Sequence, residues 1–139
     1  MAQKIRDMGG HNHMFAFFPE RGSLMEDWPP VDRGQWRRVQ LARYLIDYRG
    51  VRVDAMAFDE AGRVTGFGVD EATLESVIAS GTPFRTSGCP GKEDDISACN
   101  RPHGDSSPTD ILSFPFALAK RDLAKVRRQM DGEDVRAGL

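Results

Sequence analysis

The chain has 139 residues, of which 40% are hydrophobic and 29% are charged, and its formal net charge is −2. This length predicts one domain with a modest core, and the small net charge argues against general binding to nucleic acid or to a membrane surface. No apolar run approaches the roughly 18 to 20 residues that cross a bilayer. The N-terminal MAQKIRDMGG lacks the apolar centre of a signal peptide, so we expect a cytoplasmic protein whose two cysteines are thiols or metal ligands.

The first predicted elements are a buried strand and a long helix. Residues 13–18, HMFAFF, form an almost continuously apolar run that ends at Pro19, which is typical of a central strand in a parallel sheet. Residues 35–48, QWRRVQLARYLIDY, carry apolar side chains on two sides of a helix. Such a broad apolar surface predicts a helix packed between layers.

A hairpin and two further helices are expected next. Residues 51–58 alternate as in a strand, and DEAG separates them from a partner strand at 63–68. Residues 70–81 predict a short helix with Asp70 as N-cap and Gly81 beyond its end. Residues 116–130 predict a last helix, and we interpret its basic residues as a solvated face, the alternative being a contact for RNA or a protein partner.

The segment between residue 82 and about residue 115 has no periodicity, although it contains both cysteines. Long loops of this kind are usually functional or disordered, and a bound metal can supply the missing cohesion. Cys89, Cys99 and His103 offer three ligands and leave one position open. We expect the two cysteines to lie near each other, because prolines and a glycine that turn the backbone stand beside the thiols. The spacing alone is equally compatible with two free thiols, and the chain lacks the four cysteines that an iron–sulfur cluster usually takes.

Two further groups of polar residues adjoin the predicted strand. His11 and His13 form an H-x-H pair that suits a metal or a phosphate, although two structural histidines are the favoured interpretation. Glu20 follows the strand directly, and the carboxyl ends of parallel strands are where α/β enzymes place ligands and catalytic groups. Glu20 is therefore a candidate for ligand binding.

Several motifs together carry a family resemblance. In chain order they are HNHMFAFFPERGSLMED, RRVQLARYLID, TSGCPG and ACNRP. This arrangement resembles the C-terminal part of a radical S-adenosylmethionine enzyme of the biotin synthase and lipoyl synthase-like group. The cysteine-bearing part differs from biotin synthase and is more similar to other radical enzymes, including two-component lipoyl synthases.

The resemblance implies an α/β fold containing an incomplete TIM-type barrel end. Residues 1–81 would form this barrel end with a biotin synthase-like C-terminal region, residues 82–117 the cysteine-bearing loop, and residues 118–139 a terminal helix. The CxxxCxxC motif that defines the family is absent from this chain. We therefore expect the chain to be inactive alone and to work with a missing N-terminal barrel portion or a partner subunit.

The resemblance also implies cofactors and binding residues in the complete enzyme. S-adenosylmethionine and an iron–sulfur cluster would be the cofactors, and the substrate would be a small or carrier-bound molecule. Cys89, Cys99 and His103 are the candidate metal ligands, and the candidate substrate- or cofactor-binding residues are His13, Glu20, Arg52 and Arg101. Arg52 is the positional candidate for an arginine cluster ligand, and Arg101 for binding an anionic group. The alternatives are a small zinc-binding module and a non-catalytic interaction domain that uses the basic last helix.

Overall fold

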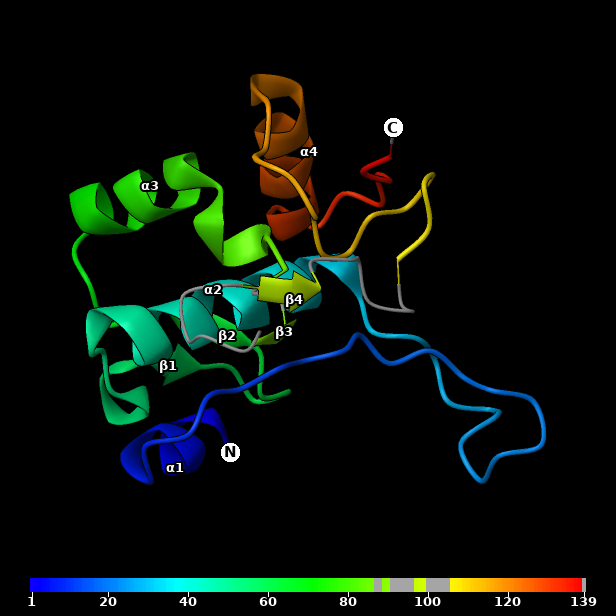
Figure 1. The fold of residues 1–139 in the computed structure, drawn as a ribbon, viewed down its shortest axis with the longest axis horizontal. Coiled ribbons are helices and arrows are strands. Elements are labelled where there is room, and N and C mark those ends of the chain that lie inside the picture. Colours follow the sequence, from blue (N-terminus) through cyan, green and yellow to red (C-terminus); the bar gives the residue numbers. More distant parts are fainter. Residues whose placement is uncertain (87–88, 91–96, 100–105, 139) are drawn as a thin grey trace.

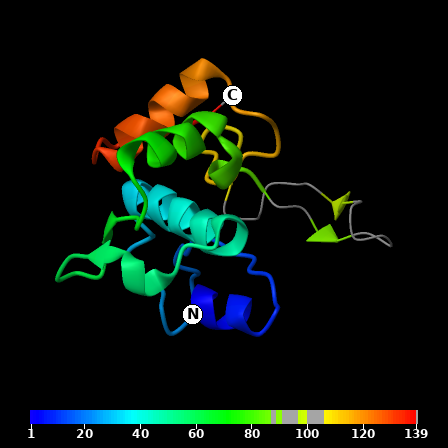
Figure 2. The ribbon, with the colours of Figure 1, turned by 90° about the vertical axis from the view of Figure 1, so that its left-hand side faces the viewer.

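The long helix α2 (Arg33–Arg49) lies at the centre of the molecule, and the other helices pack on its two sides (Figures 1 and 2). The computed structural model describes residues 1–86, 89–90, 97–99 and 106–138. Helices α3 (Glu71–Ser80) and α4 (Lys120–Met130) lie on one side of α2, and α1 (Ala2–Asp7) lies on the other. None of the helices in these ranges is long and apolar enough to span a membrane.

Helix α2 confirms the predicted helix and its broad buried surface. Its N-terminus is capped by Asp32, whose Oδ1 accepts a hydrogen bond from the Gln35 amide at 2.8 Å. At the other end Gly50 adopts the left-handed conformation that stops a helix, with φ of 67°. Both sides of the helix bury apolar residues: Trp36, Leu41, Ala42, Leu45 and Ile46. The helix is thus enclosed between layers, as its sequence indicates.

The core gathers around α2 from segments spread between residues 41 and 137. Its members are Leu41, Ala42, Leu45, Ile46, Met56, Val64, Phe67, Val77, Ile78, Phe84, Ile111, Phe114, Val126 and Ala137. Phe84 and Phe114 come from the two ends of the predicted cysteine-bearing loop, and both are almost completely buried. The two ends of that loop therefore belong to the folded body, by which we mean the helices and the segments that pack on this core.

Helices α3 and α4 also follow their sequence signals. Asp70 caps α3 by accepting a hydrogen bond from the Thr73 amide at 2.8 Å, and Gly81 ends it with φ of 70°. Val126 on α4 is fully buried, whereas Arg127 and Arg128 form ion pairs with Glu75 and Glu133 at the surface. The basic face of the last helix is thus solvated and partly neutralised by neighbouring carboxylates.

The strands are shorter than the sequence predicts, and two of them lie where no strand was expected. The expected hairpin is present as β1 (Ala57–Phe58) paired with β2 (Val64–Gly66), but residues 53–55 form a 3-10 turn, η1 (Val53–Ala55). A second antiparallel pair joins β3 (Cys89–Pro90) and β4 (Ser97–Cys99). The molecule therefore combines helices with small two-stranded sheets.

The parallel strand expected over residues 13–18 does not form. This segment has no strand assignment, and across the described ranges the one parallel pairing is the bridge between Arg85 and Phe114. A central strand needs a neighbour on each edge, whereas the backbone of Phe17 accepts a hydrogen bond from the Val31 amide in the next loop, at 3.0 Å. No barrel end is assembled within the described residues.

A pair of hydrogen bonds fixes the two ends of the cysteine-bearing region together. After α3 the chain makes the 3-10 turn η2 (Thr82–Phe84). The Thr86 amide then donates to the Phe114 carbonyl at 2.8 Å, and the Phe114 amide donates to the Phe84 carbonyl at 2.9 Å. The two ends of the region thus lie next to each other.

Candidate functional site

The two cysteines stand opposite each other in the β3–β4 pair. The antiparallel register matches Cys89 with Cys99 and Pro90 with Ser97, which leaves Ala98 as an extra residue in a bulge. Pro90 has no amide hydrogen to donate, so the ladder is interrupted beside Cys89. The prediction that the two cysteines lie near each other is confirmed at the level of the backbone.

The other two residues predicted for this site, the metal ligand His103 and the anion-binding Arg101, cannot be placed with this pair. Arg101 and His103 lie outside the described residues. Among the residues that are described, no three histidine, cysteine or acidic side chains form a group that would hold a metal ion. Within the described residues the two cysteines are paired across β3 and β4, and metal binding by them stays a prediction.

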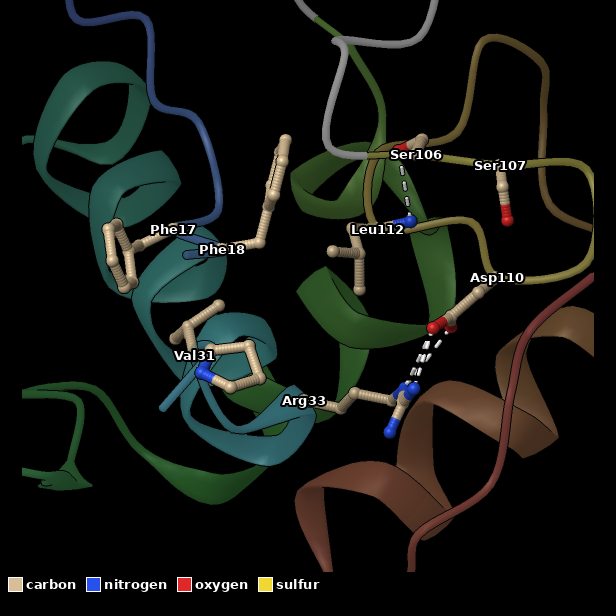
Figure 3. A pocket seen from close by; sticks show the side chains of 9 residues that line it. Phe17, Phe18, Val31, Arg33, Ser106, Ser107, Asp110 and Leu112 are labelled. Carbon is tan, nitrogen blue, oxygen red and sulfur yellow. Dashed lines mark hydrogen bonds and ion pairs between the residues drawn. The ribbon is translucent and has the colours of Figure 1, made fainter. Parts of the chain in front are cut away.

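A cavity of about 330 Å³ lies between residues 17–18 and 30–33 on one side and residues 106–112 on the other (Figure 3). Phe17, Phe18 and Val31 line one side, and Leu112 faces them from the other. The remaining lining residues are Pro30, Arg33, Ser106, Ser107 and Asp110. The cavity thus combines apolar walls with a few polar side chains at one end, which is the usual composition of a small-molecule site.

An ion pair fixes the polar end of this cavity. Arg33 Nε lies 3.1 Å from Asp110 Oδ1, and Arg33 Nη2 lies 2.6 Å from Asp110 Oδ2. Arg33 Nη1 also donates to Asp134. The hydrogen bond with Asp110 raises the pKa of Arg33 above its ordinary value. The guanidinium therefore stays charged and joins the start of α2 to two later loops.

Hydrogen bonds also fix the loop on the opposite wall. Ser106 Oγ accepts from the amides of Leu112 and Ser113, each at 3.1 Å. The Ser107 amide donates to the Asp110 carbonyl, and the Asp110 amide donates back to Ser107. This tight turn holds Asp110 in place beside Arg33. The wall formed by residues 106–112 is thus ordered by its own short-range contacts.

The predicted binding residues outside this region are not brought into the cavity. His13 and Glu20 are exposed and do not line it. Arg52 lies beside α1, with its Nη1 3.6 Å from Asp7 and its Nε 3.5 Å from Asp54. Figures 1 and 2 show α1 on the opposite side of α2 from α3 and α4. The carboxylates of Asp7 and Asp54 thus pair with Arg52 at the surface.

The inward residue of the HNH motif is its asparagine. Asn12 is buried, and its Nδ2 lies 3.4 Å from both Asp47 Oδ1 and the Ala2 carbonyl oxygen. His11 and His13 are both exposed. The sequence signal for this arrangement is the alternation itself, because residues that flank a position point away from it in extended chain. Asn12 therefore ties the N-terminal segment to α2.

A further feature is the segment of residues 15–28, which we call the apolar arm. It extends away from the helices (Figure 1). Several of its large side chains are exposed, with exposed fractions of 64% for Phe15, 50% for Phe18, 104% for Leu24 and 59% for Trp28. The arm thus leaves most of its large apolar side chains in contact with solvent.

Comparisons with protein-family models, with curated proteins and with solved structures find no match to this chain. The chemistry of the site therefore rests on the geometry of this molecule. The features that bear on function are the paired cysteines, the cavity beside the apolar arm, and the arm itself.

Proposed function

We propose that this chain is the C-terminal part of a radical S-adenosylmethionine enzyme, in which it binds substrate and an auxiliary iron–sulfur cluster. The observation that carries the proposal is the register that matches Cys89 with Cys99. Two thiolates at facing positions suit a soft metal centre. The chain has no radical activity alone, because it lacks the CxxxCxxC motif for the cluster that cleaves S-adenosylmethionine.

The residues present fit such a cluster in part. A cluster of this type is usually held by four cysteine thiolates, and β3 and β4 contribute two. The other ligands would come from groups elsewhere in the complete enzyme, with His103 as the candidate from this chain, and Arg101 would bind an anionic group beside the cluster. A non-cysteine ligand changes the reduction potential of a cluster, which suits transfer of sulfur or related radical chemistry.

The apolar arm supports the requirement for a second polypeptide portion. Leu24 and Trp28 expose large apolar surfaces that burial would remove from water, with a gain of about 25 cal/mol for each Å². We propose that the missing portion, which would carry the TIM-type barrel, covers this arm. The extended residues 13–18 would then lie at the edge of that barrel.

The cavity beside the arm is the proposed place for part of the substrate. Its apolar walls suit a hydrocarbon portion, and its polar end, where Arg33 is already paired with Asp110 and Asp134, suits an uncharged hydrogen-bonding group. Phe17 and Phe18 connect the cavity to the arm, so docking of the barrel portion closes it from one side. A small molecule or a carrier-bound chain fits this description.

The DNA upstream of the Met1 codon provides the first test. We expect an open reading frame there, or a neighbouring gene, that encodes a CxxxCxxC motif followed by barrel strands. Absence of that motif from both places would contradict the assignment to radical enzymes.

Metal analysis of the complete enzyme provides the second test. After anaerobic reconstitution with iron and sulfide, we expect the Cys89→Ser and Cys99→Ser variants each to lose the auxiliary cluster. Ser97→Ala is the matched control, because Ser97 neighbours the cysteine pair in β4 and leaves both thiols in place. Full iron content in both cysteine variants would disprove the cluster site, and zinc in place of iron would favour a zinc-binding module.

A further inference from the structure

The facing positions of the two cysteines also meet the requirements of a disulfide. Residues directly opposite in an antiparallel pair have Cα atoms about 4.5 to 5.5 Å apart and lie on the same face of the sheet. Disulfides join Cα atoms that are about 4.4 to 6.8 Å apart. We propose that Cys89 and Cys99 form a reversible disulfide that cross-links β3 to β4. This inference rests on the same cysteine pair as the proposed function, but it does not require that function to be correct.

The short strands give this cross-link a structural role. Strand β3 has two residues and β4 has three, and a two-stranded ladder of any length is marginal in water. The bulge at Ala98 and the missing amide hydrogen of Pro90 remove further ladder bonds. A covalent bond between the two strands holds a register that these few backbone hydrogen bonds maintain only weakly.

The anchoring of the region favours an internal bond over a bond between two molecules. The bonds between Thr86, Phe84 and Phe114 hold both ends of the cysteine-bearing region at the body. Each cysteine therefore meets the other at a high effective concentration, which exceeds the concentration of cysteines on other molecules in dilute solution.

The chemistry is exchange with a small oxidised disulfide such as that of glutathione. The thiolate of one cysteine attacks the small disulfide, which forms a mixed disulfide and releases one small thiolate. The other cysteine, as its thiolate, then attacks the protein sulfur of the mixed disulfide and releases the second small thiolate. Two electrons pass from the protein to the small disulfide, and the two thiol protons go to solvent.

The disulfide would also regulate metal binding by the same pair. Thiolates bind metal ions, whereas sulfurs joined in a disulfide carry no negative charge and are weak ligands. Oxidation therefore removes both candidate ligands together, and reduction restores them together.

The test is a redox titration of the full chain. The metal-free protein is equilibrated anaerobically with graded ratios of oxidised to reduced glutathione, quenched with acid, alkylated with a maleimide and weighed by mass spectrometry. We expect the wild type to pass from two maleimide adducts to none, without a lasting glutathione adduct. Cys89→Ser and Cys99→Ser should instead retain one glutathione adduct under oxidising conditions, because neither has a second thiol to displace it.

The opposite result is equally clear. A wild type that keeps glutathione on both cysteines, or keeps both maleimide adducts where the single variants are glutathionylated, would overturn the proposal. The proposed function fails on a separate observation. If the chain forms the disulfide but the complete enzyme keeps its iron in both serine variants, the redox pair is confirmed and the cluster site is disproved.

Discussion

At the scale of single residues, Arg37 makes the largest set of buried polar contacts described in the chain. Its side chain is fully buried, and its guanidinium donates to the carbonyls of Ile111 and Leu112, each at 2.6 Å. It also donates to Gln129 Oε1 at 2.7 Å, and it lies 5.3 Å from the centre of the Phe114 ring. Arg37 thus joins α2 to α4 and to the loop that lines the cavity.

We expect Arg37→Met to destabilise the protein strongly. The variant fills similar space but removes the donor to the Ile111 carbonyl and to Gln129 Oε1, at about 1 to 3 kcal/mol for each buried group left unsatisfied. Arg37→Lys should recover little, since an ammonium cannot reproduce the planar fork of donors. Urea unfolding followed by circular dichroism measures the change. Arg121→Met, at an exposed position of α4, is the control; equal stability of the two methionine variants would contradict the prediction.

At the scale of elements, α2 and α4 approach closely at Gly34. A Cβ atom at this position would lie 2.4 Å from the Gln129 carbonyl oxygen, which is too short for any real contact. Gly34 is nevertheless in the first turn of a helix, where glycine is ordinarily unfavourable. Close packing of the two helices therefore overrides helix propensity here.

We expect Gly34→Ala to lower the stability rather than raise it. Propensity alone would give a gain of up to about 1 kcal/mol, whereas overpacking typically costs about 1 to 3 kcal/mol. Chemical denaturation measures the sign. Ala124→Gly, on the exposed side of α4, calibrates the propensity effect in the same protein. A more stable Gly34→Ala variant would show that the helices can separate at this point without cost.

The ion pair between α3 and α4 gives a pH dependence with a defined sign. The hydrogen bond from Arg127 lowers the pKa of Glu75 below its ordinary value. The folded state therefore favours the charged carboxylate, so the stabilisation is present above the pKa of the unfolded state and is lost as the pH falls through the lower pKa of the folded state.

We expect Glu75→Gln to be less stable than the wild type at neutral pH and equal to it in acid. The difference should be small, since both side chains of the pair are partly exposed and solvent screens them. Thermal unfolding at about pH 7 and about pH 3 measures it, on the two sides of the ordinary glutamate pKa. A difference that persists in acid would show that Glu75 acts through packing rather than through its charge.

The sequence predicted the helices better than the strands for physical reasons. Caps such as Asp70 and Gly81 act within a few residues, so their effect can be read locally. The apolar run at 13–18 has the composition of a strand, but a strand also needs partners, and the described chain supplies none that forms a sheet with it. Residues 53–55, where the expected strand becomes a turn, show the same dependence on neighbours.

The candidate site was predictable to a similar degree. The proximity of Cys89 and Cys99 followed from the turn-forming residues beside each thiol. The pairing of Arg33 with Asp110 did not, because the two residues are separated by most of the chain and no local pattern connects them. Asn12 was overlooked in favour of its two histidine neighbours, although it is the residue that reaches the buried Asp47.

At the scale of the whole molecule, the apolar arm and the body differ in how far their apolar side chains are buried by this chain. The body has a core whose members come from α2, α3, α4 and the connecting segments. The arm has its large side chains at the surface, and Leu24 is completely exposed. The arm therefore contributes little to the stability of the body and presents apolar surface to other molecules.

We expect the double variant Leu24→Ser, Trp28→Ser to keep the stability of the wild type within about 0.5 kcal/mol. It should bind less of a hydrophobic fluorescent dye and should self-associate less in sedimentation velocity experiments. Phe114→Ser is the matched control, because Phe114 is almost completely buried and its truncation should cost about 3 to 5 kcal/mol. Strong destabilisation by the arm variant would place the arm in the folding unit.

The fixed points on either side of the cysteines also have an evolutionary consequence. Thr86 is bonded to Phe114, and Ser106 is bonded to Ser113, so the chain departs from and returns to one small area. An insertion or deletion between Thr86 and Ser106 alters the closure entropy by only about 0.6 kcal/mol for each doubling of length. Descendants of a common ancestor could therefore exchange this segment, and with it the chemistry of the thiols, while inheriting the helical body unchanged.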